Sequence, residues 1–230
     1  MLDFPFDILV LIAAGLFAGF VNTMAGGGSL LTLPLLIFLG LPPATANGTN
    51  RIAIFVSASS ATLGFRSKNI NSFPFSIYLG ITAFLGALIG ARIAVEIDGL
   101  LFNKILAIIM IAVVLLMVFK PNYKSELLKP KTTGKTLIWS MIAFFFIGIY
   151  GGFINAGIGF IIMLFLNYVN KLDLVRVNAT KVALVLIYTT GALATFILSG
   201  HINLKYGIAL ALGNAAGAFF ASRYSVRKGE

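Results

Sequence analysis

Two segments of this chain have nearly the same sequence, and in both of them glycines interrupt an apolar run. The first reads AGFVNTMAGGGSLLTLPLLIF at 18–38 and is followed by ANGTNR at 46–51. The second reads GGFINAGIGFIIMLFL at 151–166 and is followed by VNATKV at 177–182. Matched apolar segments broken by glycine or proline, one in each half of a chain, are typical of membrane folds built from internal repeats. The pattern therefore predicts two related halves, each folded around a broken membrane segment.

Long apolar runs place the chain among polytopic membrane proteins. Of its 230 residues, 59% are hydrophobic and 10% are charged, and the mean hydropathy is +1.01. Runs of about 18 or more apolar residues recur, which is the length of helix that spans a bilayer. We therefore predict an all-α polytopic membrane protein embedded in the lipid bilayer. Its apolar elements are expected at 6–23, 29–41, 45–65, 74–95, 100–119, 137–156, 159–170, 177–199 and 205–221.

The net charge of +10 comes mainly from lysines and arginines in the short segments between apolar runs. An excess of cations confined to loops orients membrane helices, with the cationic loops on the cytoplasmic side. Placing the segment 120–136 in the cytoplasm puts most of these cations inside and the N-terminus outside. No aromatic-basic groove and no zinc or helix-turn-helix pattern accompanies the charge, so we expect no nucleic-acid partner.

The same count of crossings gives the two halves opposite orientations. Residues 1–119 are predicted to form a first transmembrane repeat, 120–136 a cytoplasmic linker, and 137–230 a second repeat. An odd number of elements in the first repeat makes the second begin on the other side of the membrane, so the predicted fold is a pair of inverted-topology repeats. The second repeat stops one apolar element short of the first, and we expect a last helix to be missing from this chain.

Each repeat is predicted to begin with a glycine-broken helical hairpin. The runs 29–41 and 159–170 are too short to cross a hydrocarbon core of about 30 Å, and each follows a glycine cluster. The N–H groups at a helix start inside the membrane suit an anion, and glycine lets a ligand approach closely. The alternative is that these glycines only let helices pack closely. The candidate binding residues of the hairpins are Asn22, Gly26, Gly27, Gly28, Ser29, Asn155, Gly157 and Gly159.

A polar cluster follows each hairpin and adds buried cations to the candidate site. Its members are Asn47, Thr49, Asn50 and Arg51 in the first repeat, and Asn178, Thr180 and Lys181 in the second. Residues spaced by three and four share one face of a helix. A cation inside a membrane helix is costly, and the acidic residues all lie in loops or near the ends of apolar runs, so an anionic substrate is the natural partner. The alternative is that Arg51 and Lys181 extend to the membrane interface.

Two further residue roles are left open by the sequence. Asn22 and Asn155, at the end of each first arm, can donate to an oxyanion or satisfy the backbone freed by the bend. Other polar positions, including Ser57 and Tyr188, are interpreted as contacts between helices. The chain has no cysteine, one histidine, and no nucleotide-binding or hydrolase motif, so we expect no metal, no cofactor and no enzymatic activity.

At these motifs the chain resembles the sulfite exporter TauE/SafE family of small bacterial membrane proteins. The matching text is NTMAGGGSLLTLPLL at 22–36, GLPPATANGTNRIAI at 40–54, GGFINAGIGF at 151–160 and LDLVRVNATKV at 172–182. The resemblance implies export of sulfite, or of related sulfur oxyanions and organosulfonates, across the bacterial inner membrane. It also implies a further apolar helix at the C-terminal end.

The residues themselves allow three functions. A carrier would bind a small anion near the membrane midplane between the two repeats and alternate its access to the two sides. An anion-selective channel would use the polar cluster as a filter. A scaffold without transport would use the glycines for packing alone. The sequence leaves open whether the chain forms a homodimer.

Overall fold

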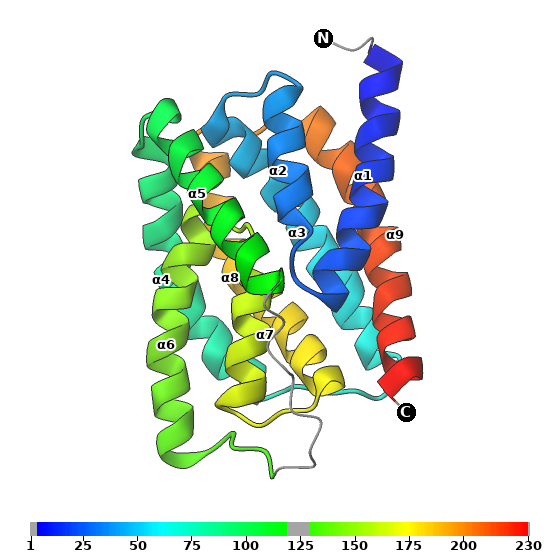
Figure 1. The fold of residues 1–230 in the computed structure, drawn as a ribbon, viewed down its shortest axis with the longest axis vertical. Coiled ribbons are helices and arrows are strands. Elements are labelled where there is room, and N and C mark those ends of the chain that lie inside the picture. Colours follow the sequence, from blue (N-terminus) through cyan, green and yellow to red (C-terminus); the bar gives the residue numbers. More distant parts are fainter. Residues whose placement is uncertain (1–3, 119–128, 230) are drawn as a thin grey trace.

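The structure is a computed structural model that describes residues 4–118 and 129–229. Within these ranges the chain folds into helices and forms no strand, which confirms the predicted all-α class (Figure 1). Six helices of the described ranges are long and apolar enough to cross a membrane. The helices are α1 Phe4–Met24, α2 Ser29–Phe38, α3 Pro43–Arg66, α4 Phe75–Glu96, α5 Gly99–Val118, α6 Gly134–Phe153, α7 Ile158–Tyr168, α8 Leu174–Leu198 and α9 Leu204–Gly229.

The observed helices follow the expected elements, with differences at some ends. Helix α8 begins at Leu174 rather than at 177, because Asp173 caps it by accepting the N–H of Arg176 at 2.9 Å. Helix α9 continues to Gly229 rather than ending at 221, and α6 begins at Gly134, inside the predicted linker. Residues 119–128, which hold most of that linker, lie outside the described ranges.

The short helices α2 and α7 follow the glycine breaks, as the hairpin prediction requires. They span 10 and 11 residues, too few to cross the hydrocarbon core of a bilayer. Helix α3 has 24 residues, but its polar motif leaves it outside the set that qualifies as a membrane span by hydropathy. Its interior is buried in protein, which is where polar residues at membrane depth are tolerated.

Helix packing falls into two equivalent sets. Helix α1 packs along α9 as α6 packs along α4, and α3 packs along α9 as α8 packs along α4. The first helix of each predicted repeat therefore lies against the fourth helix of the other. Both contacts bring backbones together at small residues: Gly15 and Gly19 face Leu210 and Asn214. On the other side of the molecule, Gly148 and Gly152 lie against Ala83 and Ala87.

The helices α3 and α8 cross at the centre and run in opposite directions. Gly48 near the start of α3 lies against Phe196 near the end of α8, whereas Phe65 and Ala179 share a buried cluster at the other ends. In Figure 1, α1 runs down the view from the N-terminus and α6 runs up it. These two pairs of helices thus point in opposite directions; the inverted repeat and its orientation in a bilayer stay predictions.

Candidate anion-binding site

The bends of the two hairpins touch one another at the centre of the molecule. Gly26 has a φ of +79° and Gly157 a φ of +71°, in the left-handed region that favours glycine. The backbone of Gly26 lies directly against that of Gly159, and a Cβ atom on either residue would collide with the other's main chain. Glycine at the two breaks therefore serves both the bend and the contact between the repeats.

The two asparagines beside the breaks hold the hairpins in place. Asn22 Oδ1 accepts the Gly28 N–H at 2.8 Å, so its oxygen satisfies backbone freed by the bend. Asn155 Nδ2 donates to Ser29 Oγ at 3.3 Å across the repeat boundary, and Tyr188 Oη donates to Asn155 Oδ1 at 2.6 Å. Of the two alternatives for Asn22, the structure shows the bond to backbone, which leaves the amide NH₂ group as the donor for any ligand.

Lys181 is buried and bonds to the end of the first helix of the other repeat. Its Nζ donates to the Thr23 carbonyl at 2.8 Å, to Asn178 Oδ1 at 2.9 Å and to Met163 Sδ at 3.3 Å. Thr23 lies in the last turn of α1, where carbonyls lack helical partners and the helix dipole is negative. A cation at this place stabilises a helix end that stops inside the protein.

Arg51 makes the matching contact with the end of α6. Its Nη2 donates to the Gly152 carbonyl at 2.8 Å, and its Nη1 donates to the Gly151 carbonyl. Asn47 Nδ2 donates to the Phe153 carbonyl at 2.7 Å, and Asn47 Oδ1 accepts from Arg51 Nη2 at 3.3 Å. Neither Arg51 nor Lys181 reaches the surface, because their exposed fractions are 0% and 1%. Backbone carbonyls and amide oxygens take the place of the acidic partner that the sequence lacks.

A cavity of about 30 Å³ lies where the hairpin bends meet α3 and α8. We call it the central cavity. A space of this size holds about two water molecules, and its lining mixes one cation, two amides and two hydroxyls with apolar side chains. The lining comes from both predicted repeats. The residues are Asn22, Thr23, Gly26, Ile54, Ser57, Ala58, Asn155, Ile158, Gly159, Lys181, Val182 and Val185.

Comparison with known proteins decides the family. The family model described as "Sulfite exporter TauE/SafE" matches residues 11–230. The chain belongs to the TauE/SafE family. It is 30% identical over 230 residues to a probable membrane transporter protein of Haemophilus influenzae, covering 100% of this chain and 89% of that protein. It is 29% identical over 227 residues to the probable membrane transporter protein YfcA of Escherichia coli strain K12, covering 98% of this chain and 83% of that protein.

A third relative is the probable membrane transporter protein ORF9 of a Sinorhizobium species, 28% identical over 230 residues. The alignment covers 100% of this chain and 87% of that protein. No solved structure matches the chain. This TauE/SafE protein is thus a multi-pass membrane transporter, and the names of its relatives describe transport rather than an enzymatic reaction.

The TauE/SafE transporter gathers part of its predicted site around the central cavity and places the rest elsewhere. Asn22, Gly26, Asn155, Gly159 and Lys181 line the cavity. Asn178 and Ser29 contact lining residues, and Gly27, Gly28 and Gly157 form the bends. Asn47 and Arg51 bind the end of α6 instead.

Three other predicted site residues, Thr49, Asn50 and Thr180, do not line the central cavity. Thr49 Oγ1 accepts the Asn203 N–H at 2.9 Å, outside the central cavity. Asn50 Oδ1 accepts from Thr32 Oγ1 at 2.8 Å, while its Nδ2 is buried without a hydrogen-bond partner. Thr180 lines a different cavity, nearer the linker.

Sequence reasoning missed two side chains of the site. Ser57 lines the central cavity and Tyr188 orients Asn155, although both were interpreted as contacts between helices. The signal was present, because Ser57 lies seven residues beyond Asn50 and Tyr188 lies seven residues beyond Lys181, about two helical turns, so each continues the helix face of a motif residue. No sequence pattern predicts the contacts of Lys181 with the Thr23 carbonyl and the Met163 sulfur, because one acceptor is a backbone group and the other belongs to an apolar side chain.

Proposed function

We propose that this protein exports a small sulfur oxyanion or organosulfonate, such as sulfite, across the bacterial inner membrane by alternating access. The anion is held in the central cavity, between the two repeats near the membrane midplane. The observation that carries the proposal is the meeting of both broken hairpins at one cavity that contains Lys181, Asn22 and Asn155. The description of the matching family adds support for the substrate class.

Lys181 supplies the charge that attracts the substrate. Among the three acceptors of its Nζ, the thioether of Met163 is the weakest, because sulfur is a poor hydrogen-bond acceptor. An anion oxygen that replaced this contact would gain a charge-assisted hydrogen bond. The amide NH₂ groups of Asn22 and Asn155 and the Ser57 hydroxyl are neutral donors that can replace water around the remaining oxygens.

The membrane potential supplies a driving force for export. With the cell interior negative, moving each negative charge outward gains about 2.3 kcal/mol per 100 mV. Export of an anion therefore needs no proton relay. The predicted inversion of the repeats supplies the mechanism, since exchanging the conformations of the two halves would move the central cavity from one side of the membrane to the other.

Thermal stabilisation of the purified protein tests the binding step. Sulfite, sulfate, thiosulfate, sulfoacetate and phosphate are compared, and a bound anion at one hundred times its Kd stabilises the folded state by about 2.7 kcal/mol. We expect a sulfur oxyanion to raise the melting temperature of the wild type and of Lys135→Gln, a substitution at an exposed lysine. Lys181→Gln should lose this shift. No shift with any of the anions would reject the proposed substrate class.

The anion-selective channel remains the rival function, and packing around the central cavity favours the carrier. The cavity is separated from the next one along α3 by apolar side chains of the cluster that contains Phe65 and Val182. A carrier requires such closure, whereas a conducting channel requires a continuous path. Single-channel currents from the reconstituted protein would favour the channel instead.

A further inference from the structure

Three cavities lie in a row along the α3–α8 contact. The central cavity is lined on α3 by Ile54, Ser57 and Ala58. A middle cavity of about 10 Å³ follows; its lining residues on these two helices are Thr62, Phe65, Arg66 and Ala179. An outer cavity of about 390 Å³ is lined by the loop 69–74, by Phe75 at the start of α4, by Pro130 and Thr132 of the linker, and by Leu172, Arg176 and Thr180.

The order of the lining residues gives the row a direction. Residue numbers rise along α3 from 54 to 66 between the central and the middle cavity, and they fall along α8 from 185 to 176 between the central and the outer one. Because α3 and α8 run in opposite directions, both changes lead to the same end of the molecule, where the linker lies. A rise of 1.5 Å per residue places Phe65 about 12 Å beyond Ser57 along α3.

A small apolar cluster separates the central cavity from the middle one. It is distinct from the main hydrophobic core and consists of Ala61, Phe65, Ala179, Val182, Ala218 and Val226. Val182 lines the central cavity, whereas Phe65 and Ala179 line the middle one. The barrier is therefore a single layer of side chains, and Phe65, which is 1% exposed, is its largest member.

The opposite end of the α3–α8 contact is tightly packed. The guanidinium of Arg51 lies 5.7 Å from the centre of the Phe196 ring, an arrangement typical of a cation–π interaction. Gly48 lets α3 approach so closely that a Cβ there would lie 2.9 Å from Cδ1 of Phe196. The bond from the Asn203 N–H to Thr49 ties the start of α9 to the same turn of α3.

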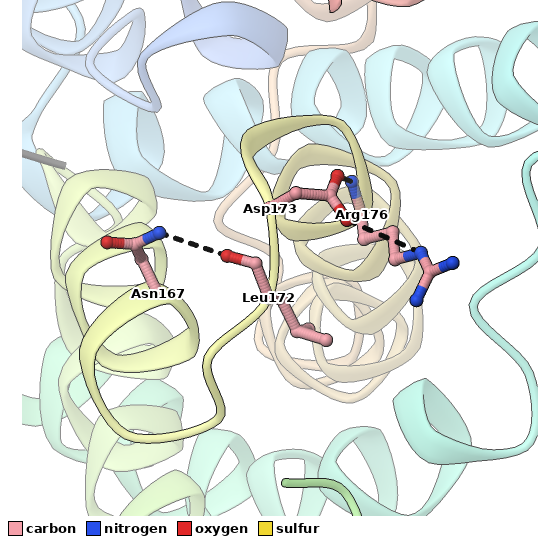
Figure 2. Close-up of polar contacts among 4 residues, drawn as sticks. All are labelled: Asn167, Leu172, Asp173 and Arg176. Carbon is pink, nitrogen blue, oxygen red and sulfur yellow. Dashed lines mark hydrogen bonds and ion pairs between the residues drawn. The ribbon is translucent and has the colours of Figure 1, made fainter. Parts of the chain in front are cut away.

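Cations lie along the row on its linker side. Arg66 lines the middle cavity and Arg176 lines the outer one. Asp173 pairs with Arg176 at 3.3 Å and caps α8, as Figure 2 shows, and both side chains of the pair are more than half exposed. Positive charge along a narrowing path raises the local concentration of anions. Arg66 therefore supplies positive charge at the middle cavity, whereas Asp173 offsets part of the charge of Arg176 at the outer one.

We propose that this row of cavities is the linker-side access path to the central cavity, and that Phe65 with Ala179 and Val182 forms its gate. The packing of Arg51, Gly48 and Phe196 closes the other side. The inference rests on the proposed function, because a path to the central cavity has a role only if that cavity receives cargo. It assigns to Thr180 a place on the path rather than in the binding site.

Cysteine accessibility tests the path, since the chain has no cysteine of its own and each introduced thiol is unique. The probes are Thr180→Cys, Thr62→Cys and Ser57→Cys, treated with a charged, membrane-impermeant methanethiosulfonate on either face of vesicles. Thr133→Cys and Ser199→Cys, both at exposed positions at opposite ends of the molecule, report which face is which.

The gate sets the expected order of modification rates. From the face that labels Thr133→Cys, we expect the outer position 180 to react fastest, then 62, with 57 slower than 62 by about tenfold, since its rate follows the population of the open gate. From the face that labels Ser199→Cys, position 57 should react more slowly than from the linker side, because the packing of Gly48 and Arg51 against Phe196 closes that side in this structure. Equal or faster labelling of position 57 from that face would overturn the path.

Removing the ring of Phe65 tests the gate itself. Phe65→Ala should raise the rate at Ser57→Cys from the linker side by about tenfold, because the barrier is one side chain thick. Phe144→Ala removes an equally buried ring from the main core and should leave that rate unchanged. The same change in both variants, or none in Phe65→Ala, would overturn the gate.

The labelling requires no substrate, so it fails independently of the proposed function. If the thiols react in the predicted order but no oxyanion raises the melting temperature, the proposed substrate class is rejected and the access path is supported. If an oxyanion raises the melting temperature but the thiols do not react in the predicted order, the substrate class is supported and the access path is rejected.

Discussion

Two buried cations, Arg51 and Lys181, bind the carbonyls of helix ends rather than acidic side chains. Arg51 bonds the carbonyls of Gly151 and Gly152, and Lys181 bonds that of Thr23. A buried carbonyl that loses its donor costs about 1–3 kcal/mol of stability. The two cations differ in one respect: Lys181 lines the central cavity and Arg51 does not. We infer that Arg51 is structural and Lys181 binds substrate.

This difference predicts the effect of replacing Arg51. Arg51→Gln should lower the free energy of unfolding by about 2 kcal/mol or more, because two buried carbonyls lose their donors. Arg92→Gln is the matched control, since Arg92 forms an exposed pair with Glu96, and such pairs contribute about 0–1 kcal/mol. Thermal unfolding in detergent measures both. Equal stability of Arg51→Gln and the wild type would contradict the structural role.

The sequence predicts Arg51 and Lys181 inside the protein, which their burial confirms, but it could not name their partners. Counting acidic side chains misses backbone carbonyls, which become acceptors only where a helix stops inside the protein. Periodicity places Ser57 on the helix face of Asn50 and Tyr188 on that of Lys181, so the sequence also held the information for these two. The Met163 contact depends on the fold of the hairpin and could not be predicted.

At the scale of elements, the broken hairpins place the central cavity. Their short second arms, α2 and α7, follow from run length, and the glycine clusters predict the bends. The exact helix ends were less predictable. Asp173 caps α8, so the helix begins about a turn before the predicted apolar run. The last turns of α9 are polar, so the length of the apolar run does not predict them.

The hairpin contact predicts that Gly26 tolerates no side chain. Gly26→Ala would place a Cβ at a positive φ and against the backbone of Gly159, so we expect a loss of stability well above about 1 kcal/mol, or failure to fold. Gly134→Ala separates the two causes, because Gly134 also has a positive φ but nothing within 4 Å of its Cβ position. It should cost only about 1 kcal/mol. Similar thermal shifts for both variants would contradict the close contact of the bends.

In the whole molecule, two sets of helices pack together around α3 and α8. One set is α1 with α9, and the other is α6 with α4. Because α1 lies on α9 and α6 on α4, each repeat holds the first helix of the other, and neither half packs by itself. This exchange follows from helix–helix packing, which the sequence does not encode as a local pattern. The bilayer-facing surface is apolar, with Phe17, Leu85 and Ile108 among its exposed side chains.

The charge of the loops predicts the orientation of the protein in the membrane. The positive-inside rule predicts that the linker lies in the cytoplasm and that the N-terminus lies outside. Thr133→Cys should therefore react with an impermeant thiol reagent in inside-out vesicles and not in intact cells. Reaction in intact cells alone would reverse the predicted orientation and, with it, the direction assigned to the access path.

Flux of sulfite through the reconstituted protein tests whether Lys181 holds the exported anion. Proteoliposomes loaded with sulfite are given an interior-negative potential, and efflux is compared for the wild type, Lys135→Gln and Lys181→Gln. We predict sulfite efflux that rises with the potential in the first two, and an outside-to-inside sulfite concentration ratio at equilibrium of about tenfold for each 60 mV and each charge moved. Folded Lys181→Gln should release no more sulfite than protein-free liposomes. Wild-type efflux from Lys181→Gln would contradict the site.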